Sequence, residues 1–263
     1  MIKFFRKIRQ NLLNEGKTTR YFKYAIGEIV LVVIGILFAL QINNWNIERL
    51  ERKNEKMILL DLQVEFQENL VDAERVKKGN DGIYNAMSAI QQNSVEKNYN
   101  QKIMDSLMYY VFDWFDYTPK PGASNNLINS GNLNLISNKE LRKLLTLWSG
   151  VAAELDDDEQ LAVRYSQDII IPYIVTRYPM SNLELFDKNV GYYLKDNNNL
   201  EEFEPIRNIS YNVKGLLQDN IFNNHVSVKK MYARHNALEC VNVVNTCRSI
   251  LDIIEQELGQ SSL

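Results

Sequence analysis

The sequence is poor in the residues that build tight turns. Among 263 residues there are 11 glycines and 5 prolines. A fold made of many short strands needs frequent tight turns, and Gly and Pro supply most of them. The scarcity of both therefore argues against a many-stranded β fold.

Residues that commonly carry metal or redox chemistry are also scarce. The chain has two histidines, His225 and His235, and two cysteines, Cys240 and Cys247. No Cys or carboxylate stands out beside the histidines at ligand spacing, so we predict no metal site and no cofactor. On one helix the cysteines would lie about 10 Å apart, too far for a disulfide. We interpret them as small apolar side chains on a buried stripe, with an inter-chain disulfide as the alternative.

Familiar catalytic motifs are missing as well. The sequence contains no G-x-S-x-G, P-loop, G-x-G-x-x-G or H-E-x-x-H pattern. The run Asp156–Glu159 could attract calcium, but it lacks the spaced oxygens and turn glycine of an EF-hand loop. We interpret this run as a solvated helix start, and we nominate no catalytic residue.

Charge is distributed unevenly along the chain. Residues 1–43 hold seven Lys or Arg and two acidic residues, which gives a net charge of +5. Residues 44–263 hold 23 Lys or Arg and 31 acidic residues, which gives a net charge of −8. A basic head and an acidic body indicate different surroundings. The acidic body repels polyphosphate, so we expect no nucleic-acid partner.

One long apolar run follows the basic head. Ile29–Leu40 is unbroken, and its extension to Tyr24 and Ile42 would make about 28 Å of helix, close to the thickness of a bilayer core. Glu28 lies about one turn inside the boundary, where its cost is smaller than the gain from the run. We predict a transmembrane helix at 24–43, in preference to a buried helix of a soluble core.

The flanks of this segment predict its orientation. No small-x-small cleavage site follows it, which indicates an uncleaved signal anchor. Seven Lys or Arg precede the span, and the four that follow closely are interleaved with acids. The positive-inside rule then places residues 1–23 in the cytoplasm and residues 44–263 in the periplasm of a two-membrane bacterium.

Residues 2–13 have the pattern of a basic amphipathic helix that lies on an anionic leaflet. A disordered basic tail that only sets the topology is the alternative. The residues that we expect to contact the membrane surface are Lys3, Phe4, Phe5, Arg6, Lys7 and Arg9.

Within the span, three residues can share one helix face. Gly35 and Ala39 form a small-xxx-small pair, and Glu28 lies seven residues before Gly35. Such a face predicts self-association of the transmembrane helix. An isolated span, in which Glu28 reaches toward the cytoplasmic side, is the alternative.

The N-terminal residues resemble a known family. The stretches Met1–Arg9, Tyr24–Leu37 and Ala39–Asn46 are similar to the start of uncharacterised single-span membrane proteins from flavobacteria and other Bacteroidetes, and Ser130–Lys139 is similar more weakly. Phe38 and Ile47 depart from the usual residues. The resemblance implies a membrane location and a bacterial origin, and it implies no activity.

The remaining sequence predicts an all-α bundle of a stalk helix and further helices. Ser137–Glu140 has the composition of an N-cap, Gly79–Gly82 that of a break, and Pro172 is expected to kink or end a helix near Ile171. The expected helices cover about 46–76, 83–92, 101–115, 141–155, 156–171 and 226–258, with a loop at 117–126 and an irregular stretch at 178–210.

Aromatic residues gather beside the proline-containing loop. They can line a pocket or a partner surface, although plain core packing is the alternative. The residues of this candidate surface are Tyr110, Trp114, Phe115 and Tyr117.

Together these patterns predict a non-enzymatic, membrane-anchored interaction or scaffold module of the cell envelope. Its expected partners are the lipid bilayer, a second copy bound through the transmembrane and stalk helix, and an envelope protein that the sequence does not identify. The alternatives are a ligand sensor that signals through a partner and an unrecognised envelope enzyme.

Overall fold

The computed structural model describes residues 18–185 and 209–260, and the described residues form helices without a strand. This confirms the predicted all-α class. The chain divides into two compact units, Met1–Met57 and Ile58–Leu263. The predicted membrane-surface residues from Lys3 to Arg9 lie outside the described residues.

Helix α2 (Thr18–Glu96) contains the predicted span. Its apolar part is long enough to cross a membrane, and none of that part is buried inside the structure. Ile29 and Leu37 keep 63% and 58% of their surface exposed. A helix that is apolar on all sides is normally buried, either in a large core or in a bilayer. The helix therefore has the length and composition of a transmembrane segment.

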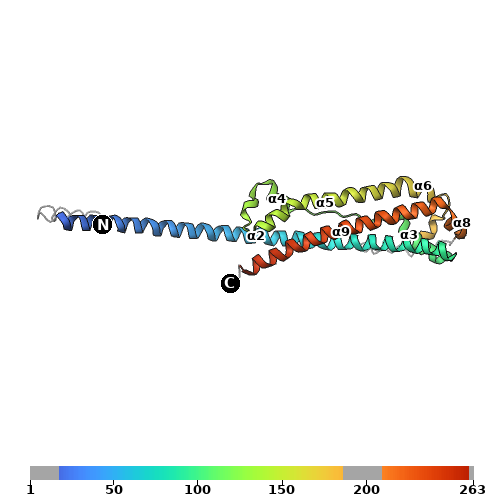
Figure 1. The fold of residues 1–263 in the computed structure, drawn as a ribbon, viewed down its shortest axis with the longest axis horizontal. Helices are drawn as coiled ribbons and strands as arrows, with labels where there is room; N and C mark the ends of the chain where they lie inside the picture. Colours follow the sequence, from blue (N-terminus) through green and yellow to red (C-terminus); the bar gives the residue numbers. More distant parts are fainter. Residues whose placement is uncertain (1–17, 186–208, 261–263) are drawn as a thin grey trace, which may run out of the picture. The chain divides into compact units, whose positions relative to one another are not determined.

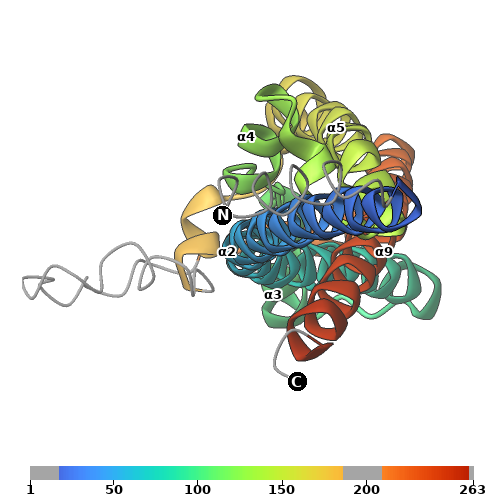
Figure 2. The same cartoon turned by 90° about the vertical axis from the view of Figure 1, so that its left-hand side faces the viewer.

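In the second unit, α5 (Lys139–Tyr165) and α9 (Asn220–Gln260) run alongside the part of α2 that follows Ile58 (Figures 1 and 2). The core between them is apolar, and the Phe66 and Trp148 rings meet edge to face at 5.0 Å. Cys240 and Cys247 are buried in this core as free thiols. Burial raises the pKa of both thiols to about 12, so they behave as apolar side chains.

A second core is formed by the shorter helices, the C-terminal end of α2 and the N-terminal end of α9. Its buried side chains include Met87, Met104, Met108, Ile174 and Phe222. The elements that complete this unit are α3 (Gln101–Phe112), α4 (Ala123–Asn129), η1 (Asn132–Leu135), η2 (Ser166–Ile170), α6 (Ile171–Ile174), η3 (Met180–Leu185) and α8 (Val213–Gln218). Helix α3 ends before the predicted Phe115, and the predicted loop is helical from Ala123.

The predicted break at Gly79–Gly82 is wrong, because α2 continues through it to Glu96. A Cβ atom at Gly79 would collide with the Phe115 ring, and one at Gly82 would lie 3.2 Å from Cε1 of Tyr110. These glycines let aromatic rings approach the helix backbone. Tertiary packing thus explains residues whose local preference indicates a turn.

Helix α5 begins where the sequence predicts and ends later. The Asn138 side chain caps it by accepting hydrogen bonds from the backbone N–H of Glu140 and of Leu141, both 3.0 Å long. The predicted helix start at Asp156–Glu159 is wrong, because these residues lie inside α5. Before Pro172 the backbone adopts a π-helical turn, as expected near a residue that cannot donate its backbone hydrogen bond.

Candidate functional site

The loop that joins α3 to α4 is bound to one face of α2. Asn69 Oδ1 accepts hydrogen bonds from the Lys120 backbone N–H (2.9 Å) and the Tyr117 hydroxyl (3.0 Å). One turn earlier, Glu65 accepts from the Ser124 backbone N–H (3.0 Å) and the Ser124 hydroxyl. Because these acceptors follow helical spacing, one face of α2 holds both the loop and the start of α4.

The four predicted aromatic residues occupy different environments. Tyr117 is only 2% exposed and belongs to the core, and burial raises its pKa. Phe115 and Tyr110 are half-buried against Gly79 and Gly82. Trp114 alone among the four is exposed, at 39%. A partner surface here would therefore rest on Trp114.

A small cavity lies behind this loop, between α2, α5 and α9. It is lined by Asn80, Glu159, Lys229 and Asn236, among others, and its volume of about 10 Å³ suits one water molecule. Oε1 of Glu159 and Oδ1 of Asn236 are buried and have no hydrogen-bond partner within the described part of the chain. The cavity has room for a water molecule and none for an organic substrate.

Two ionisable groups border the cavity. Glu159 is 2% exposed and accepts a 2.7 Å hydrogen bond from the Tyr117 backbone N–H, and burial raises its pKa to about 7. Lys229 donates 2.8 Å hydrogen bonds to the Asp113 carbonyl and the Ser166 hydroxyl, and burial lowers its pKa to about 8. Both groups are held by the protein itself, which favours a structural role.

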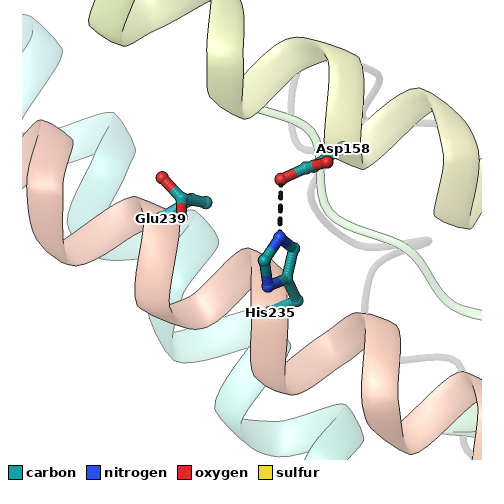
Figure 3. A group of neighbouring side chains, drawn as sticks. All are labelled: Asp158, His235 and Glu239. Carbon is teal, nitrogen blue, oxygen red and sulfur yellow. Dashed lines mark ion pairs between the residues drawn. The ribbon is translucent and has the colours of Figure 1, made fainter.

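A group of potential metal ligands lies on the side of α5 and α9, as Figure 3 shows. Nε2 of His235 is 2.9 Å from Oδ2 of Asp158, and Glu239 follows His235 by one helical turn. One ligand atom from each residue lies within 4.8 Å of the others. The Asn242 side chain donates a 3.0 Å hydrogen bond to the Glu239 carboxylate.

The sequence analysis missed this group because it considered the acidic run around Asp158 and the two histidines separately. His235 and Glu239 have the i, i+4 spacing that places two ligands on one helix face, and this signal was overlooked. Nothing local in the sequence indicates that Asp158 lies beside them. The other histidine, His225, is elsewhere, with Nδ1 3.0 Å from the Tyr165 hydroxyl.

The residues predicted for membrane-helix association all lie on α2. Gly35 and Ala39 are exposed, Glu28 is partly exposed, and a Cβ atom at Gly35 would meet no atom within 4 Å. That face has room for close approach by another helix.

A surface groove of about 330 Å³ lies between α2 and α9. Two ion pairs line it: Lys77 with Asp81 along α2 at 2.7 Å, and Arg248 of α9 with Glu74 of α2 at 2.6 Å. The lining also includes Lys78, so charges of both signs are mixed along the groove and no patch of one sign marks it as a site for a charged ligand.

Comparison with known protein families gives a match over part of the chain. A model of a family of unknown function, DUF6090, matches residues 28–149, slightly less than half of the chain. No curated protein and no solved structure matches significantly. Over the stretch from the apolar part of α2 into α5, the chain is thus similar to a family without an assigned activity.

Proposed function

We propose that this protein is a membrane-anchored, non-enzymatic helical module of the bacterial cell envelope that associates with a second copy of itself. The proposal places residues 1–23 in the cytoplasm, residues 24–43 in the inner membrane and residues 44–263 in the periplasm. The basic head, the acidic body and the resemblance of the first 46 residues to single-span proteins of Bacteroidetes support this placement.

Exposed apolar residues on α2 beyond the span carry the proposal of self-association. Leu50 and Met57 lie in the first unit, and their exposed fractions are 54% and 50%. Val64 and Val71 lie in the second unit and are also exposed. Each of these residues follows the previous one by seven positions, so the row recurs near one side of α2 with one apolar position per heptad. We call this row the seam.

The span itself supports the same association. Gly35 and Ala39 offer a small-residue surface on which two helix backbones can approach closely. Helix contacts in the membrane and beyond it would reinforce each other, because the first contact raises the effective concentration for the second. The outer bundle is then available for a partner in the envelope.

Disulfide crosslinking of the full chain in membranes tests the proposal. The variant Leu50→Cys places a thiol on the proposed seam, and Arg52→Cys places one about 200° around the same helix. We expect an oxidant to produce a covalent dimer from Leu50→Cys and not from Arg52→Cys. The wild type should remain monomeric on a non-reducing gel, because Cys240 and Cys247 are buried.

Equal crosslinking of both variants would indicate random collision in the membrane, and no crosslinking of either would indicate a monomer. Either result would remove self-association through this face of α2.

A further inference from the structure

The ligand chemistry of the group on α5 and α9 is that of a transition-metal site. Asp158, His235 and Glu239 supply one imidazole and two carboxylates. Zn²⁺ is bound by imidazole nitrogen and carboxylate oxygen, and zinc sites with three protein ligands leave the fourth position to water or substrate. We propose that these three side chains bind one divalent transition-metal ion of the Zn²⁺ class. This inference is independent of the proposed membrane topology and self-association.

The geometry of the three groups is close to that of a coordinated ion. Bonds of about 2.0–2.2 Å place neighbouring ligand atoms of a tetrahedral ion roughly 3.3–3.6 Å apart. Nε2 of His235 and Oδ2 of Asp158 are 2.9 Å apart, and the full group lies within 4.8 Å. Rotations of the side chains would have to widen the first separation and shorten the longest one for all three atoms to reach one ion.

The supporting elements are regular helices that pack against each other. His235 and Glu239 stand on successive turns of α9, and Asp158 reaches them from α5 (Figure 3). The hydrogen bond from Asn242 orients the Glu239 carboxylate, as partners of metal ligands commonly do. Ligands on rigid elements lose little freedom when an ion binds.

The chemistry of the three ligand atoms discriminates between classes of cation. Ca²⁺ takes six to eight oxygen ligands, and Mg²⁺ keeps most of its water in octahedral geometry. Here one ligand of three is an imidazole nitrogen, which suits zinc, copper, nickel or iron. The two carboxylates neutralise the charge of a divalent ion. The thiols of Cys240 and Cys247 are buried in the apolar core and are not part of this group.

Metal titration of the full chain tests this site. The protein is purified in detergent, stripped with a chelator and titrated with Zn²⁺ in competition with a fluorescent zinc indicator. We expect one Zn²⁺ per chain and a rise in the melting temperature on binding. His235→Gln and Asp158→Asn should each weaken the affinity at least tenfold, because each removes a ligand.

His225→Gln is the matched control, since it removes the other histidine of the chain and should leave the affinity unchanged. His235 is more than half exposed, so its replacement should leave the helicity and melting temperature of the stripped protein intact. No saturable Zn²⁺ binding would overturn the proposal. Equal affinity in wild type and His235→Gln would also overturn it, as would Ca²⁺ binding at the same strength, because an acidic surface alone would then attract cations.

Discussion

Single residues in the interior of the second unit make its stability depend on pH. Glu159 has an ordinary pKa of 4.5, and burial raises this value to about 7 in the folded protein. Between these values the folded state binds more protons than the unfolded state, so the free energy of unfolding falls as the pH rises. Below pH 4.5 the carboxyl is neutral in both states and costs nothing, and above about pH 7 the full cost is present.

The variant Glu159→Gln should abolish this dependence. Glutamine keeps an acceptor for the Tyr117 backbone N–H and carries no charge. We expect the variant to be more stable than the wild type at pH 8 by about 1–3 kcal/mol, and equally stable near pH 4. Denaturant unfolding of the full chain in detergent across this range measures the difference.

Asp157→Asn provides the control, because Asp157 is an exposed acid two positions away on the same helix. Its pH profile should follow that of the wild type. If Glu159→Gln follows the wild type too, the buried carboxyl does not have the raised pKa described above.

Elements of the fold owe their boundaries to two kinds of signal. The start of α5 follows a local rule, the capping of free N–H groups by Asn138, and it was predictable. The continuity of α2 through Gly79–Gly82 was not predictable, because these glycines accommodate the rings of Phe115 and Tyr110, which lie later in the chain. The candidate metal site shows the same division. The spacing of His235 and Glu239 on α9 can be recognised in the sequence, whereas Asp158 comes close to them only because α5 packs against α9.

The variant Gly79→Ala should destabilise the second unit. Alanine favours a helix by up to about 1 kcal/mol over glycine, but its methyl group would collide with the Phe115 ring. Overpacking of this kind costs about 1–3 kcal/mol, so we expect a net loss in the free energy of unfolding. Thermal unfolding monitored by helicity would show a lower melting temperature.

Gly150→Ala is a matched control in α5, where a new Cβ atom would meet nothing within 4 Å. There the gain in helix propensity should act alone and stabilise the protein by about 0.5–1 kcal/mol. A gain at both glycines would show that Phe115 does not pack against Gly79.

The whole molecule combines a helix suited to a bilayer with a bundle suited to water. Apolar side chains are exposed along the first part of α2, whereas the second unit buries its own core. Water solvates the apolar first part of α2 unfavourably, and a bilayer core solvates the charged surface of the second unit unfavourably. The proposed topology follows from this division and from the basic head.

Labelling of an exposed cysteine tests that topology. Val95 near the end of α2 is 81% exposed, so Val95→Cys should react readily with a maleimide. We expect a membrane-impermeant maleimide to label this variant in intact spheroplasts as fully as after lysis. Labelling only after lysis would place the second unit in the cytoplasm and contradict the proposed orientation.

The sequence by itself determined what depends on neighbours within a few turns of helix. The apolar run of the span, the helical periodicity and the cap at Asn138 are of this kind, because each is read from adjacent residues. Only the tertiary structure decided that Gly79 serves packing, that Glu159 is buried and that Asp158 meets His235. Those properties depend on which helices pack together, and no local pattern specifies that choice.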